Sequence, residues 1–89
     1  MNYTIKVCKD FIEVEQEGNA KLFRVSSVCF IEKKSKRVRI EMNSPWATEF
    51  DFRCESDKFY SEFMTAMRIA PNMPVGAGLM SVAKACSLK

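Results

Sequence analysis

Apolar and polar residues alternate along the first half of the chain, and this period of two is typical of half-buried β-strands. The first alternating stretch is interrupted by Lys9 and Asp10. A two-residue turn at this point places Val7 opposite Ile12, so that both side chains lie on the same face of a hairpin. The sequence therefore predicts two antiparallel strands at its start.

Three more turns continue the antiparallel pairing. Gly18 and Asn19 have the residue types preferred at the centre of a tight turn, and a turn centred on them places Val14 opposite Phe23 and continues the register to Val25. The pairs expected from the later turns, at residues 34–35 and 43–46, are Ile31 with Val38, Cys29 with Ile40, Val38 with Phe52 and Ile40 with Phe50. In all of these pairs the apolar side chains fall on the same face, so the hairpins can belong to one sheet.

One face of this sheet collects apolar side chains and the other collects most of the charge, as in an antiparallel sheet covered on one side. The inward residues are Ile5, Val7, Ile12, Val14, Phe23, Val25, Cys29, Ile31, Val38, Ile40, Phe50 and Phe52. Because the stretch from Lys21 to Glu32 is too long for one straight strand of so small a domain, we expect a bend at Ser26 and Ser27. The predicted fold is α+β, with a curved five-stranded antiparallel meander packed by one amphipathic C-terminal helix.

The hydrophobic period changes to that of a helix after Cys54. The apolar residues that recur at helical spacing are Phe59, Phe63, Ala66, Met67 and Ala70, with Tyr60 and Met64 beside them. Prolines in residues 71–74 end this helix. We expect residues 1–70 to form one α+β domain. Residues 71–89 are expected to form a hinge and a second, weaker helix or extended segment that packs on the domain or on a partner.

Several apolar residues point to the face of the sheet that should be polar. Leu22, Val28 and Phe30 fall on this outer face, and Trp46 lies in the last turn. Neighbouring exposed apolar residues usually mark a covered surface. We therefore expect a partner-binding surface, completed by Leu79 and Met80 of the C-terminal segment. The alternative is that the C-terminal segment itself folds back over this face.

Basic residues gather around the third turn, in a chain of net charge +3. They are Lys33, Lys34, Lys36, Arg37 and Arg39. Together with Phe30 and Trp46 they could contact phosphates and stack on bases, so a nucleic-acid-binding module is the alternative function. Against this, Glu32 and Asp51 are expected to neutralise two of the arginines across the strands.

The sequence lacks the residues that most catalytic sites need. It has no histidine, no Gly-rich phosphate loop and no paired-carboxylate motif, so we expect no enzymatic activity and no cofactor. The four cysteines, Cys8, Cys29, Cys54 and Cys86, are too widely spaced for a zinc site and predict reduced thiols, with Cys29 and Cys54 pointing into the core. Met64 and Met67 are expected in the core as well.

The layout of residues 3–70, a curved meander followed by a helix, resembles half of a pleckstrin-homology-like barrel. The size of the chain is similar to that of small phage-encoded inhibitors of host proteins. These resemblances concern layout and size only, and no functional residue carries over from them. The function we expect is that of a small non-catalytic interaction module, an inhibitor or accessory factor of phage or bacterial origin. We expect it to act as a cytoplasmic homodimer with no membrane contact and no small-molecule substrate.

Overall fold

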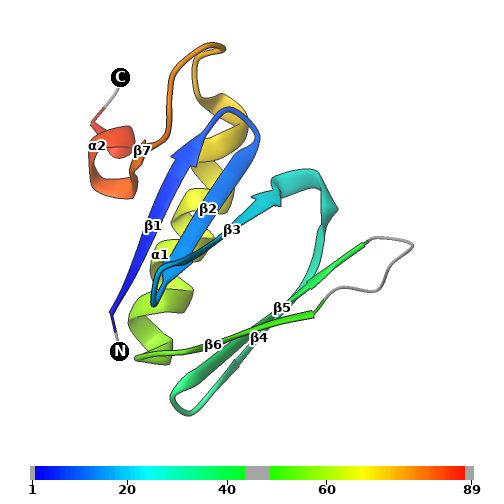
Figure 1. The fold of residues 1–89 in the computed structure, drawn as a ribbon. Coiled ribbons are helices and arrows are strands. Elements are labelled where there is room, and N and C mark those ends of the chain that lie inside the picture. Colours follow the sequence, from blue (N-terminus) through cyan, green and yellow to red (C-terminus); the bar gives the residue numbers. More distant parts are fainter. Residues whose placement is uncertain (1, 44–48, 88–89) are drawn as a thin grey trace.

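A computed structural model describes residues 2–43 and 49–87 (Figure 1). The described residues form an α+β fold with two antiparallel sheets and one main helix. The strands are β1 (Tyr3–Cys8), β2 (Phe11–Gln16), β3 (Asn19–Arg24), β4 (Val28–Lys34), β5 (Arg37–Met42), β6 (Glu49–Arg53) and β7 (Met80–Ser81). The helices are α1 (Ser56–Ile69) and α2 (Val82–Cys86), with 3₁₀ turns η1 (Val25–Ser27) and η2 (Ala70–Asn72).

The first sheet has the strand order β3-β2-β1-β7. Its first hairpin has the predicted register, with Val7 opposite Ile12. Both of these side chains are fully buried. Asp10 adopts a positive φ of 66° in the turn, and its backbone N–H donates to the carbonyl of Ala70 at 3.0 Å. The turn is thereby tied to the C-terminal end of α1.

The predicted register of the second hairpin is wrong by two residues. Ile12 pairs with Phe23, and Val14 pairs with Lys21. The turn is centred on Glu17 and Gly18 instead of Gly18 and Asn19, and both central residues have positive φ, 53° and 81°. Two central residues with positive φ give the turn a backbone twist that matches the right-handed twist of the flanking strands. The position of this turn determines which residues of β2 and β3 pair.

The expected bend near Ser26 and Ser27 is confirmed, since η1 interrupts the long run there. The bend does more than curve one strand. At η1 the chain leaves the first sheet and starts a second sheet of order β4-β5-β6. The single five-stranded meander is therefore not observed. In Figure 1, β4, β5 and β6 lie below the sheet of β1, β2 and β3, and α1 lies behind β1 and β2.

The second sheet confirms one predicted hairpin and corrects the other. Val38 lies opposite Phe52, as predicted for β5 and β6. Between β4 and β5, however, Ile31 pairs with Ile40, because the turn is at Ser35-Lys36 with Lys36 at φ 60°. A register irregularity between Val28 and Phe30 leaves Cys29 exposed, so its predicted inward position is wrong.

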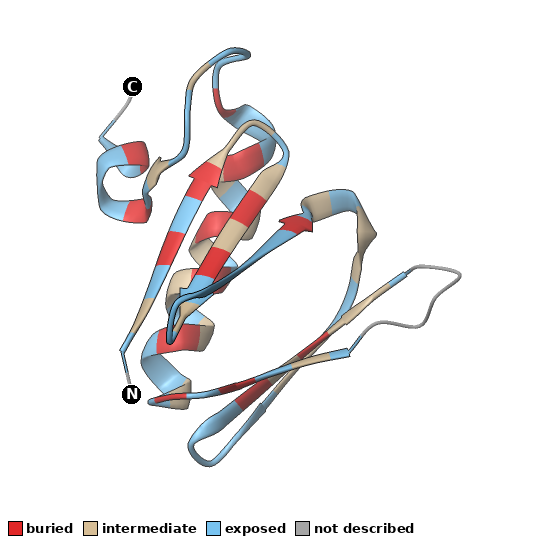
Figure 2. Ribbon diagram, in the orientation of Figure 1, coloured by how far each residue is buried: buried red, intermediate tan, exposed pale blue. Residues whose placement is uncertain are grey.

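The predicted helix is confirmed as α1, which closes the core between the two sheets. Phe23 meets Phe50, Phe52 and Phe63 edge-on, with ring centroids 5.1, 6.1 and 5.8 Å away. Figure 2 shows buried positions alternating along the strands and recurring along α1. The buried apolar residues are Ile5, Val7, Ile12, Val14, Phe23, Val38, Ile40, Phe52, Cys54, Phe59, Phe63, Ala66, Ala70, Met73, Val82 and Ala85. Val25, Ile31 and Phe50 are partly buried against this core.

The C-terminal segment folds back onto the domain, but at a different place from the one considered in the sequence. β7 pairs with β1, placing Met80 opposite Val7, and α2 follows it with Val82 and Ala85 buried. The second helix is thus confirmed in a shorter form. Because β7 and β3 lie at opposite edges of the first sheet, this segment leaves Leu22 uncovered, at 59% exposure.

Within residues 2–43 and 49–87, no helix has the length and apolar character needed to cross a membrane.

Candidate protein interface

The structure distributes the predicted partner-binding residues over three places. Leu22 lies on β3 in the first sheet, while Val28 and Phe30 lie on β4 in the second sheet. Met80 is in β7, at the far edge of the first sheet, and Leu79 directly precedes it. Trp46 lies outside the described residues. The described residues of this set therefore do not form one surface.

Two of them do meet other apolar side chains, in a cavity of about 260 Å³ between β4 and α1. We call it the β4–α1 groove. It is lined by Val28, Cys29, Phe30, Ile31, Tyr60, Met64 and Met67. Phe30 and Met64 are 46% and 39% exposed, so the groove opens to solvent. The predicted core position of Met64 is therefore wrong, and Met67 is only partly buried.

A network of charged side chains supports Phe30. The guanidinium of Arg39 lies over the Phe30 ring, with Cζ 5.7 Å from the centroid. Arg39 itself is held by three carboxylates, with N···O distances of 2.6 Å to Glu49, 3.3 Å to Glu32 and 3.5 Å to Glu41. These carboxylates raise the pKa of Arg39, although its partial desolvation acts in the opposite direction. Phe30 is thus packed on one side by a fixed cation and remains accessible on the other.

β4 also carries unused hydrogen-bonding groups. It is an edge strand, because the described part of the second sheet contains no neighbour for it other than β5. In an antiparallel pair, alternate residues direct their N–H and C=O groups away from the partner strand. The free edge of β4 therefore presents backbone donors and acceptors next to the apolar β4–α1 groove.

An ion pair joins β4 to the start of α1. Lys33 Nζ donates to Asp57 Oδ1 at 2.8 Å and also lies 5.4 Å from the centroid of the Tyr60 ring. The hydrogen bond and the negative charge of Asp57 raise the pKa of Lys33. Asp57 lies in the first turn of α1, where a negative charge also interacts favourably with the helix dipole.

The predicted basic cluster is largely neutralised within the fold. Besides Lys33 and Arg39, Lys34 lies 3.5 Å from Glu32, and Arg37 lies 3.8 Å from Asp51. Only Lys36, at the turn, has no carboxylate within 4.0 Å among the residues that the structure describes. The five basic side chains therefore offer little uncompensated positive charge.

Sequence reasoning missed the contribution of α1 to the surface. Tyr60, Met64 and Met67 all line the groove, whereas the helical period assigned them to the core side. The sequence does contain a signal for this exposure. The apolar stripe along α1 is wider than one face of a sheet can cover, so some of its side chains must remain at the surface.

The cysteines do not form a chemical site in the described part of the chain. Cys29 and Cys86 are exposed, whereas Cys54 is buried as predicted, and burial raises the pKa of its thiol. Burial also raises the pKa of Cys8, with Asp10 and Glu13 adding to the effect. Raised pKa values favour the protonated form of these two thiols and so slow their reactions.

Comparison with known proteins gives no match to a family model, to a curated protein or to a solved structure.

Proposed function

We propose that this protein is a non-catalytic protein-interaction module that acts as a homodimer through the β4 edge and the β4–α1 groove. The observation that carries the proposal is the coincidence of an edge strand with an open apolar groove beside it. Adding a strand to a sheet edge supplies backbone hydrogen bonds, and the adjacent groove accepts side chains of the added strand. A second copy of the chain brings both a strand and a matching groove.

The charge distribution along β4 favours antiparallel pairing of two copies. The strand begins with apolar Val28 and ends with Lys33 and Lys34. A parallel arrangement would place the lysines of the two copies side by side, which is unfavourable. An antiparallel arrangement centred on Ile31 instead places Lys34 beside the second copy's Val28, and Phe30 beside its Glu32. Like charges are thereby kept apart.

The size of the domain also favours association. A chain of 89 residues buries a smaller share of its surface on folding than a larger domain does, and two large apolar side chains remain exposed at this groove. Contiguous exposed apolar side chains are typical of interfaces. In the proposed dimer, Phe30 and Met64 are buried against the second copy.

Nucleic-acid binding is the competing function, and the geometry favours it less. Its phosphate contacts would come from basic residues that mostly lie within 4.0 Å of carboxylates. Fluorescence anisotropy with single-stranded and duplex oligonucleotides at about 50 mM salt tests it, because phosphate contacts give the strongest binding at low salt. Tight, salt-sensitive binding would favour this function over the dimer proposal.

Sedimentation equilibrium tests the proposed dimer, with matched surface substitutions. We expect the wild-type protein to have twice the 10.2 kDa chain mass at high concentration. Phe30→Lys and Met64→Lys should each weaken the dimer by about 2 kcal/mol, roughly thirtyfold in Kd. Leu22→Lys is the control, because it places the same charge at an exposed apolar position of the other sheet.

A wild-type protein that stays monomeric at all concentrations would contradict the proposal. A dimer weakened by Leu22→Lys and not by Phe30→Lys would also contradict it, since the interface would then lie on the first sheet. Far-UV circular dichroism of each variant confirms that the fold is retained.

A further inference from the structure

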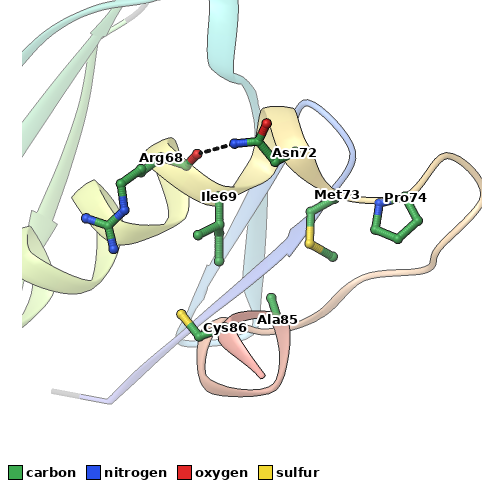
Figure 3. A pocket seen from close by; sticks show the side chains of 7 residues that line it. All are labelled: Arg68, Ile69, Asn72, Met73, Pro74, Ala85 and Cys86. Atoms are coloured by element: carbon green, nitrogen blue, oxygen red, sulfur yellow. Dashed lines mark hydrogen bonds between the residues drawn. The ribbon is translucent and has the colours of Figure 1, made fainter. Parts of the chain in front are cut away.

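A second cavity, of about 610 Å³, lies between the C-terminal end of α1 and α2 (Figure 3). It is lined by Arg68, Ile69, Asn72, Met73, Pro74, Ala85 and Cys86, none of which lines the β4–α1 groove. Its volume falls within the range of about 300–1,000 Å³ that is typical of small-molecule sites. The cavity is therefore large enough for a ligand of its own.

Most of the wall is apolar and comes from two parts of the chain. In Figure 3, Ile69 and Met73 project from the end of α1 and η2 toward Ala85 on α2. Met73 and Ala85 are each only 5% exposed, so these two positions are fixed by packing. Pro74 extends the apolar wall at the end where the chain leaves the helix. A hydrocarbon group that packs against this wall is removed from water, which is favourable.

The polar group at the other end of the cavity is Arg68 (Figure 3). Within the described ranges, no carboxylate lies within 4.0 Å of its guanidinium. Asn72 donates to the backbone carbonyl of Arg68 at 3.4 Å and leaves the guanidinium donors unused. A guanidinium presents its N–H donors in a fork that matches the two oxygens of a carboxylate.

We propose that this cavity binds a small amphipathic monocarboxylate, that is, an acid with one carboxylate and an unbranched or branched hydrocarbon chain. The carboxylate lies against Arg68, and the chain packs along Ile69, Met73, Pro74 and Ala85. The C-terminal end of a helix repels anions, so the recognition of the carboxylate depends on Arg68. The proposal is independent of the proposed dimer, since the two surfaces share no residue.

Cys86 provides a direct reporter of occupancy, because it is exposed and lines the cavity. The experiment measures alkylation of individual cysteines by iodoacetamide, using peptide mass spectrometry, with decanoate present below the concentration at which it forms micelles. At a decanoate concentration of twice its Kd, two thirds of the sites are filled, so the Cys86 rate should fall about threefold. Cys29 lies outside this cavity and is the internal reference. With the protein diluted to the monomeric state, so that β4 is uncovered, its rate should not change.

Three comparisons identify the group that recognises the ligand. Decan-1-ol should protect Cys86 less than decanoate does, because it lacks the charge. Arg68→Gln should remove most of the protection by decanoate, whereas Lys84→Gln, which removes a positive charge from α2 outside the cavity, should preserve it. Arg68 is exposed, so its replacement should leave the fold intact.

The proposal is overturned if decanoate leaves the Cys86 rate unchanged, or if it slows Cys29 and Cys86 equally. Equal protection by decanoate and decan-1-ol would overturn it as well, because the cavity would then not recognise a carboxylate. Full protection by decanoate in the Arg68→Gln variant would have the same meaning.

Discussion

Lys33 on β4 and Asp57 in the first turn of α1 form an ion pair, with Nζ 2.8 Å from Oδ1. This contact joins the edge strand to the helix that forms the opposite wall of the β4–α1 groove. The ion pair also neutralises the charge of Lys33, one of the basic residues that the sequence suggests for binding phosphate. The same residue is thus part of the proposed protein interface and part of the argument against a nucleic-acid interface.

Phe23 and Leu22 are neighbours in β3 and should respond to truncation very differently. Phe23 is fully buried and meets three other phenylalanine rings, whereas Leu22 is 59% exposed. Phe23→Ala should lower the free energy of unfolding by about 3–5 kcal/mol, and Leu22→Ala should change it by less than about 0.5 kcal/mol. Urea unfolding followed by circular dichroism measures both values. Similar costs for the two substitutions would contradict the assigned faces of β3.

The inward and outward faces of the strands could largely be predicted from the sequence, but the exact cross-strand partners could not. The first hairpin is correct because Lys9 and Asp10 mark its turn clearly. The second and third hairpins are each displaced by two residues. A displacement of two keeps paired side chains on their predicted faces, and the exception is Cys29, at the irregularity in β4. Hydrophobic alternation cannot distinguish such registers, because its period is also two. Only the backbone of the turns decides, as at Glu17 and Gly18.

The groove and the second cavity were harder to predict because they depend on contacts between distant segments. Phe30 and Val28 could be identified as apolar residues without a place in the core, but their neighbours Met64 and Tyr60 come from a helix about thirty residues later. The position of β7 depends on two residues pairing with β1, which is too short a segment to give a periodic signal. The separation of the sheets likewise depends on η1, which no hydrophobic pattern marks as a change of sheet.

Tyr3 should make the protein less stable at alkaline pH. Its hydroxyl is buried without a hydrogen-bond partner, and burial, with the nearby charge of Glu62, raises its pKa. The folded state therefore favours the neutral phenol. The stability this contributes is complete below the ordinary tyrosine pKa of about 10 and is lost as the pH rises above it.

Replacement of Tyr3 by Phe tests this assignment. Tyr3→Phe keeps the edge-on packing against Phe59, whose ring centroid lies 4.9 Å away, and removes the unpaired hydroxyl. We expect unchanged or slightly higher stability at neutral pH and a smaller loss of stability above pH about 10. Urea midpoints measured over this pH range give the comparison. A strongly destabilised variant at neutral pH would show that the hydroxyl has a partner.

The four cysteines should be alkylated at different rates. Cys29 and Cys86 are exposed, whereas Cys54 is buried and burial raises its pKa. Cys8 has a raised pKa for the same main reason. In protein dilute enough to be monomeric, we expect iodoacetamide at mildly alkaline pH to modify Cys29 and Cys86 first, Cys8 more slowly and Cys54 only after unfolding. Rapid modification of Cys54 in the native protein would contradict its position in the core.

The most direct test of the proposed interface is hydrogen exchange of backbone amides, measured by NMR at several protein concentrations. Association through β4 predicts that amides on its free edge exchange more slowly as the concentration rises. Amides of β3, an edge strand of the first sheet, should exchange at a constant rate. Slower exchange confined to β3, or exchange in β4 that does not depend on concentration, would contradict the proposed homodimer.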